Sequence, residues 1–72
     1  MSNKNFYKKL GKRIKELRLE KNLTQSDLAE IIDMHYSYPG EIERAEKKPS
    51  LDTIIKLANA FSIKVSELFN GL

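Results

Sequence analysis

Apolar residues recur every three to four positions along most of this 72-residue chain, which is the spacing of helices that bury one face. The first such stripe predicts a helix over about 4–21. Its apolar positions are Phe6, Leu10, Ile14, Leu17 and Leu19. Asn22 follows it and is a residue that tolerates the left-handed backbone of a helix end. No segment alternates with the period of a strand.

Two short helices are predicted next. Thr24 and Asp27 have the spacing of a capping box, which predicts that a second helix begins there and runs over about 25–32. Only three residues separate it from a third helix expected over 36–45. Two short helices joined by so tight a turn cannot lie antiparallel, so we expect a steep crossing, as in a helix-turn-helix at about 25–45.

The last third of the chain predicts two more helices. Ser50 is placed to cap a fourth helix over about 51–60. After a break at 62–64, a short fifth helix is expected over about 65–70. The expected apolar face of the fourth helix is Leu51, Ile54, Ile55, Leu57, Ala58 and Phe61. The sequence therefore predicts an all-α, compact five-helix fold, with residues 1–72 as one domain because so short a chain can fill only one core.

The composition argues against several functional classes. The chain has no cysteine, and His35 is its only histidine, so neither a disulfide framework nor a metal site is expected. Nothing suggests a cofactor or a small-molecule substrate, and no set of side chains could assemble an active site, so we do not expect an enzyme. The start of the chain lacks a signal peptide's apolar run, and no stretch is long enough to span a membrane. We therefore expect a cytoplasmic protein without a membrane partner.

The net charge of +3 is unevenly distributed. Residues 1–21 carry eight basic and two acidic side chains, a net charge of +6, whereas residues 22–46 carry one basic and six acidic ones, a net charge of −5. The remaining residues add +2. A basic first helix fits a polyanionic partner, but a solvated helix face explains the charge equally well. The charge alone does not decide between the two.

Several short motifs give the chain a family likeness over about residues 10–69. In chain order they are Leu23-Thr24-Gln25, Leu28-Ala29, Ile42-Glu43-Arg44, Pro49-Ser50-Leu51 and Ser66-Glu67-Leu68-Phe69. In this order and spacing the chain resembles the phage repressor and Cro-type (xenobiotic-response-element) helix-turn-helix domains, which include the controller proteins of restriction-modification systems.

This resemblance implies a DNA-binding transcription regulator or repressor. Its partner would be double-stranded DNA, with the second helix across the phosphate backbone and the third helix in the major groove. The matching positions imply base-facing roles for His35, Tyr36, Ser37 and Glu41. They imply phosphate contacts for Gln25, Arg44, Lys47 and Lys48, with Arg18 close to the phosphates. Such contacts position the protein but do not read the sequence.

Most of these positions also allow a purely structural interpretation. Tyr36 and Tyr38 could be partly buried core aromatics, and His35 could be a helix-capping or surface residue. Glu41 could belong to a solvated face, and Lys47 and Lys48 could be ordinary loop lysines. The resemblance also implies that Arg18 and Glu43 form a partly buried salt bridge between the first and third helices.

The resemblance and the apolar C-terminus together suggest a homodimer. One small domain makes few base contacts, and a two-fold dimer reading half-sites about 34 Å apart on a palindromic operator solves this. The apolar side chains that the monomer core does not need are candidates for the dimer interface, namely Ile63, Val65, Leu68 and Phe69. Alternatively, Val65 and Leu68 complete the monomer core.

Three residues depart from the family pattern. Asp33 and Ala45 stand where the family has glycine, so Asp33 would have to adopt a left-handed backbone and Ala45 would weaken the expected cap at the end of the third helix. Pro39 stands where the family has a core isoleucine or leucine. If the third helix begins at Tyr36, Pro39 removes the N–H that would bond to the His35 carbonyl. If the helix begins at Pro39, the proline occupies a permitted position after an extended turn.

The sequence leaves the meaning of Pro39 open. A natural divergence with compensating packing and an engineered replacement of isoleucine both fit. Pro39→Ile is expected to raise both stability and DNA affinity. The competing interpretation is that natural repacking has made proline the better fit, so that isoleucine would be overpacked. The alternatives to a DNA-binding regulator are therefore an antitoxin-like protein-interaction module and a variant whose recognition helix binds DNA poorly.

Overall fold

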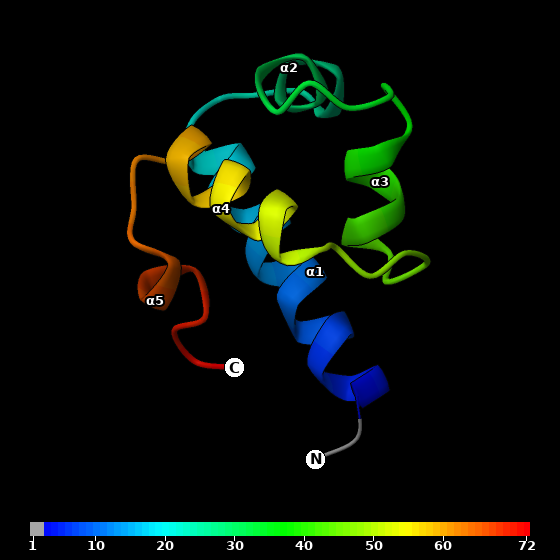
Figure 1. Cartoon of the computed structure of the whole chain (residues 1–72), viewed down its shortest axis with the longest axis vertical. Coiled ribbons are helices and arrows are strands. Elements are labelled where there is room, and N and C mark those ends of the chain that lie inside the picture. The colour runs from blue at the N-terminus through cyan, green and yellow to red at the C-terminus, as the bar shows by residue number, and fades with distance from the viewer. Residues whose placement is uncertain (1–2) are drawn as a thin grey trace.

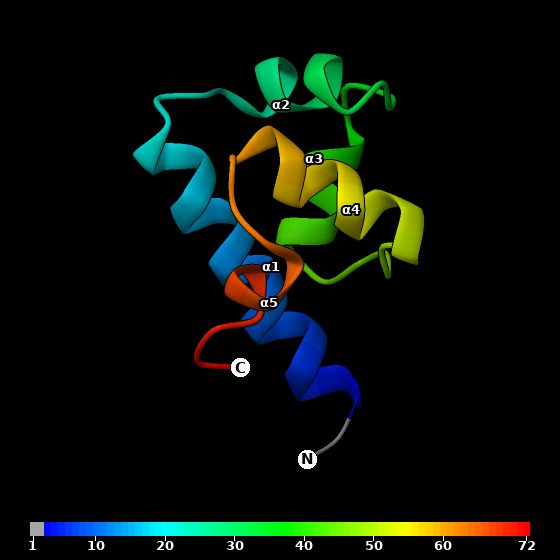
Figure 2. The ribbon, with the colours of Figure 1, turned by 60° about the vertical axis from the view of Figure 1, so that its left-hand side comes forward.

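The computed structural model describes residues 3–72, and within this range it contains five α-helices and no strand. The helices are α1 (Asn3–Glu20), α2 (Gln25–Ile31), α3 (Tyr38–Glu43), α4 (Leu51–Ala60) and α5 (Val65–Leu68). The predicted all-α, five-helix fold is thus confirmed. α1 is the longest element, α2 lies across one end of it, and the chain returns through α5 to the side of α1 (Figures 1 and 2). No helix in the described range is long and apolar enough to cross a membrane.

The core forms where the apolar faces of the five helices meet. α1 contributes Leu10, Ile14 and Leu17, the central part of its predicted stripe. The other helices and their ends contribute Leu28, Ile32, Tyr38, Ile42, Ile54, Leu57, Phe61 and Leu68. Burial of these side chains is the main favourable contribution to folding, and it brings the short helices α2 and α3 together although neither is long enough to be stable alone.

Some apolar residues that the sequence assigned to buried faces are exposed to solvent, and for these the prediction was wrong. Leu19 is 55% exposed because it follows Leu17 by two positions, which places it on the other side of α1. Leu51 and Ile55 lie one turn apart on α4 and are 71% and 43% exposed. The core covers only one side of α4, and Leu51 and Ile55 lie outside the covered side.

Four helices end on a residue with a left-handed backbone, and none of these residues is glycine. The residues are Asn22, Asp33, Ala45 and Ser62, with φ values of 57° to 59°. After each of them the chain folds back; for example, the Glu46 N–H donates to the Glu41 carbonyl at 2.8 Å. The expected left-handed angles at Asn22 and Asp33 are confirmed. Without glycine, each such end carries a steric cost.

Side chains close the beginnings of α2 and α4 as predicted. In α2 the Asp27 N–H donates to Thr24 Oγ1 at 3.0 Å, and the Thr24 N–H donates to Asp27 Oδ2 at 2.9 Å. Hydrogen bonding of the Asp27 carboxylate to Thr24, first to its backbone N–H and then to its side chain, lowers the pKa of the Asp27 carboxyl. In α4 the Ser50 hydroxyl accepts from the Thr53 N–H at 3.2 Å. Both helices therefore begin where the capping residues stand.

α3 is shorter than the predicted range of 36–45, and this changes the interpretation of Pro39. The helix begins at Tyr38, so the proline is its second residue, where an N–H would have no partner within the helix. The His35 carbonyl accepts instead from the Tyr38 N–H at 2.9 Å. Ser37 has near-helical angles, so the preceding turn is not extended. The expected loss of a hydrogen bond was therefore wrong, and Pro39→Ile has no bond to restore.

Candidate nucleic-acid interface

The helix-turn-helix is formed by α2 and α3, which cross steeply. In Figure 1 α2 is seen nearly end-on, whereas α3 runs down the picture. α3 packs against both α1 and α2. His35 and Tyr36, in the turn that precedes α3, are exposed at the surface.

Arg18 of α1 and Glu43 of α3 form a buried ion pair. Arg18 Nε donates to Glu43 Oε2 at 2.7 Å and Nη2 donates to Oε1 at 3.2 Å, with the two side chains only 8% and 4% exposed. The remaining nitrogen, Nη1, donates to the Leu23 carbonyl at 2.8 Å. The pair therefore ties the end of α1, the loop before α2 and the end of α3 together. Its burial shields Arg18 from a direct role at the surface.

Gln25 joins the same ion pair from the start of α2. Its Nε2 donates to Glu43 Oε1 at 3.1 Å. One carboxylate thus accepts from both α1 and α2, which places the Gln25 side chain beside α3. Sequence reasoning treated Gln25 only as a phosphate contact, because nothing local links it to a residue eighteen positions away.

Gly11 explains how α1 and α3 come so close. A Cβ atom at Gly11 would lie 2.5 Å from the Glu43 carbonyl oxygen and 2.6 Å from that of Ile42. Only glycine allows this backbone approach. Sequence reasoning missed Gly11; a glycine beside Leu10 in the apolar stripe of a long helix was the available signal.

The two tyrosines near the start of α3 have different environments. Tyr38 is 9% exposed and belongs to the core, as its structural interpretation proposed. Tyr36 is 71% exposed, and its ring lies against that of His35 with 4.5 Å between the centroids. Of the two, Tyr36 alone is available for contact with a partner.

The other base-facing candidates form a chain of polar contacts beside Tyr36. Ser37 Oγ lies 2.8 Å from His35 Nδ1 and 3.4 Å from Glu41 Oε1. The same Glu41 oxygen lies 3.5 Å from Lys47 Nζ. The structure therefore brings His35, Ser37, Glu41 and Lys47 together, although Lys47 comes from beyond the end of α3.

The remaining basic candidates have partners of their own. Arg44 Nε and Nη2 donate to the two carboxylate oxygens of Glu46 at 2.9 and 3.1 Å on the surface. This hydrogen bonding raises the pKa of Arg44 and lowers that of Glu46. Lys48 Nζ lies 5.4 Å from the centre of the Tyr7 ring. Lys48 is therefore turned toward α1, away from the cluster around Glu41.

The structure corrects one residue of the expected dimer interface. Leu68 is fully buried in the core, so its side chain cannot form a surface. Ile63, Val65 and Phe69 are partly buried and pack against the same core, with Phe69 beside Phe6. The alternative interpretation of Leu68, completion of the monomer core, describes its position.

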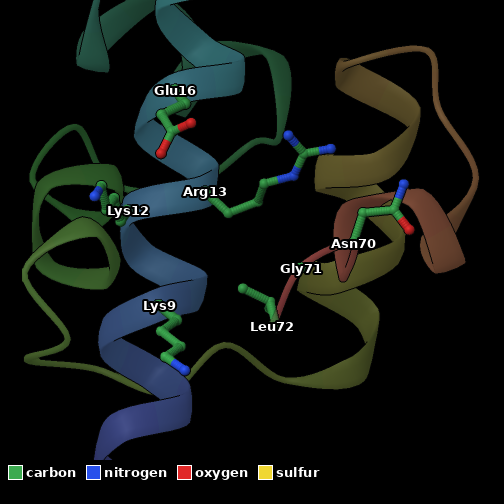
Figure 3. Close-up of a pocket in the computed structure, with 7 residues that line it drawn as sticks. All are labelled: Lys9, Lys12, Arg13, Glu16, Asn70, Gly71 and Leu72. Carbon is green, nitrogen blue, oxygen red and sulfur yellow. The ribbon is translucent and has the colours of Figure 1, made fainter.

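A hollow of about 320 Å³ lies between α1 and the residues that follow α5. It is lined by Lys9, Lys12, Arg13, Glu16, Asn70, Gly71 and Leu72. Figure 3 shows it on the side of α1 away from α2 and α3. Arg13 is held there by a hydrogen bond from Nη2 to the Glu67 carbonyl at 3.0 Å. In the described part of the chain no three acidic or histidine side chains are grouped to bind a metal.

Comparison with known proteins matches this architecture. A family model described as helix-turn-helix matches residues 14–68. The immunity repressor protein of Bacillus phage phi105 is 44% identical over 59 residues, which cover 82% of this chain and 41% of the repressor. The chain spans about half, or less, of the length of the first curated relatives that it matches.

Two solved structures are similar along most of their own length. The restriction-modification controller protein C.AhdI from Aeromonas hydrophila superposes with a TM-score of 0.81 at 41% identity, covering 89% of this chain and 96% of that one. SinR, a master regulator for biofilm formation solved in complex with DNA, superposes with a TM-score of 0.77 at 34% identity, covering 85% of this chain and 98% of that one.

Proposed function

Because this chain belongs to the helix-turn-helix family of transcriptional regulators, we propose that it binds specific DNA sequences as a homodimer on a palindromic operator in the cytoplasm. One observation carries the proposal. α3 is anchored at its C-terminal end by the Arg18–Glu43 pair, whereas the turn before it presents exposed Tyr36 beside Ser37 and Glu41. The similarity to SinR, which was solved with DNA, supports DNA as the partner.

The side chains in the turn before α3 and in its first turn suit contacts with DNA bases. The major groove admits one helix, and side chains on its first turn reach the base edges. There the Glu41 carboxylate can accept from a cytosine amino group, the Ser37 hydroxyl can donate or accept, and the Tyr36 ring can contact a thymine methyl group. His35 and Lys47 would hold this cluster in place, since both lie within contact distance of it.

The dimer is proposed from the apolar side chains that one chain leaves uncovered. Ile63, Val65 and Phe69 remain as the candidate seam after Leu68 is removed from it. Leu51 and Ile55 on α4 form a second apolar site that the sequence assigned to the core. A second copy of the chain is the expected occupant, because a two-fold dimer doubles the number of base contacts.

DNA binding is tested with Tyr36→Ala. We expect the chain to bind a fragment upstream of its own gene more tightly than a mixed-sequence duplex, with a steep loss of affinity as salt rises. Tyr36→Ala should lower the specific affinity about tenfold or more at unchanged thermal stability, because the side chain is exposed. Fluorescence anisotropy and thermal melts measure the two. Leu19→Ala is the control, since Leu19 is exposed outside the helix-turn-helix.

A flat dependence of affinity on salt, or equal binding of all duplexes, would contradict the proposed function.

The dimer is tested by sedimentation of the wild type, Val65→Glu and Leu51→Glu. If the seam is at α5, only Val65→Glu should produce monomers. A wild-type chain that stays monomeric at high concentration would remove the dimer from the proposal.

A further inference from the structure

Gly40 lies at the centre of the polar contacts between α2 and α3. A Cβ atom at this position would lie 2.8 Å from Arg44 Nη1, 3.1 Å from Gln25 Oε1 and 3.4 Å from Gln25 Nε2. Arg44 follows Gly40 by one helical turn, so its side chain folds back over the glycine. Gln25 reaches the same place from the start of α2. Because Gly40 has no side chain, the ends of the Arg44 and Gln25 side chains can both lie next to its backbone.

Both polar groups keep donors that the protein does not use. Glu46 binds Nε and Nη2 of Arg44, and the nitrogen above Gly40 is the remaining one, Nη1. Glu43 is an acceptor, so the amide group of Gln25 must turn its nitrogen toward that carboxylate. That nitrogen carries two hydrogens, and one of them is left. The two groups thus have fixed directions and free donors side by side.

We infer that Gly40 is a positioning residue for phosphate binding, because its missing side chain lets the Arg44 guanidinium and the Gln25 amide contact one backbone phosphate of DNA together. The inference rests on the DNA-binding function proposed above. Two donors that are already fixed lose less conformational freedom on binding than two mobile side chains. A guanidinium and an amide together suit a phosphate, which accepts several hydrogen bonds at once.

Gly40→Ala tests the inference. The new methyl group would displace the ends of two side chains and not the backbone, and alanine favours a helix more than glycine does. We therefore expect an unchanged or higher thermal midpoint. Affinity for a mixed-sequence duplex of about 20 base pairs should fall about tenfold, and the slope of log K against log salt should become shallower by about one. A purely structural glycine would instead lower the thermal midpoint.

Two further variants make the test specific. Asn59→Ala adds alanine to the exposed side of α4, away from the pair, and should leave DNA affinity unchanged. In an Arg44→Ala background, Gly40→Ala should cause a smaller further loss of affinity than in the wild type, because only the Gln25 amide is left to be displaced. The Gln25 side-chain amide signals of the free protein should also shift in Gly40→Ala when followed by NMR.

The outcomes separate the inference from the proposed function. A wild-type chain that does not bind the duplex overturns the DNA-binding function before any variant is compared. If the wild type binds, and Gly40→Ala binds equally well with the same salt slope, the positioning role of Gly40 is wrong. Losses that add fully in the Arg44→Ala background would also overturn it, since the glycine would then act independently of the arginine.

Discussion

α1 and α2 hold α3 in different ways. α1 touches the backbone of α3, since a Cβ atom at Gly11 would fall within 2.6 Å of two α3 carbonyl oxygens. Beside Gly40, α2 meets α3 through the end of a side chain, because the atoms nearest to a Cβ at that position belong to the side chains of Gln25 and Arg44. A backbone contact cannot be relieved by rotating a side chain, whereas side-chain ends can move. The contact at Gly11 therefore limits how α3 can move against α1, and the contact at Gly40 adjusts the polar surface of α3.

Glu43 joins the two contacts. Its carboxylate accepts from Arg18 of α1 in a buried pair and from Gln25 of α2 nearer the surface. A change on the α1 side should therefore cost stability first, while a change on the α2 side should alter binding first. The following substitutions test that difference, from the largest expected effect to the smallest.

Arg18→Met should destabilise the fold most. It keeps the apolar stem of the side chain but leaves the buried Glu43 carboxylate without its charged partner, which costs about 3 to 5 kcal/mol of unfolding free energy. Urea denaturation measures the loss. Arg44→Met is the matched control, because it breaks an exposed pair with Glu46 and should change stability little. Equal losses in the two variants would contradict the contrast between the α1 side and the surface.

Gly11→Ala should come next. Its methyl group would press on the carbonyls of Ile42 and Glu43, so α1 and α3 must separate, at a cost of about 2 to 3 kcal/mol typical of overpacking. The midpoint of urea denaturation should fall with an unchanged slope. Gly40→Ala makes the same chemical change on the α2 side and should not lower the midpoint. The comparison fails if both glycine variants lose the same stability.

Ala45→Gly should stabilise the C-terminal end of α3. Ala45 has a φ of 59°, where a Cβ atom is unfavourable, and glycine removes that cost. The gain should be about 1 kcal/mol or less, because glycine also increases the freedom of the unfolded chain. Ser62→Gly, with a φ of 58° after α4, should gain a similar amount. Thermal melts that show a loss in both variants would contradict the steric argument.

Thr24→Ala should have the smallest effect, on the start of α2. The Thr24 side chain is the second cause of the lowered pKa of Asp27, so its removal should raise that pKa part of the way back, while the hydrogen bond from the Thr24 N–H to the carboxylate remains. A lowered folded-state pKa gives stability that is present above the ordinary value of 3.8 and is lost as the pH falls through the folded value. NMR titration of the Asp27 carboxyl measures the shift. An unchanged pKa would show that the hydroxyl contributes nothing.

The sequence predicted the helices well because their signals are local. The apolar spacing predicted α1 and α4 to within about a residue, and Thr24 and Ser50 marked where α2 and α4 begin. These features depend on contacts within one or two turns. α3 was predicted two residues too long at each end, because its length depends on the turn before it and on Ala45 after it.

The candidate site was predicted only in part. The family resemblance pointed to Arg18 with Glu43 and to the surface around Tyr36, but not to the roles of Gly11 and Gly40. A glycine has no side chain to suggest a contact, and its value depends on which atoms approach it from another helix. The cost of Pro39 was likewise misjudged, since it depends on the residue at which α3 begins.

The sequence by itself determined the helix-turn-helix fold, because periodicity, caps and left-handed helix ends act over a few neighbouring residues. Only the tertiary structure decided which side of each helix is covered, and so left Leu51 exposed while burying Leu68. It also decided that one carboxylate, Glu43, would meet both Arg18 and Gln25. Such contacts depend on how whole helices are oriented in space, and no spacing along the chain specifies that orientation.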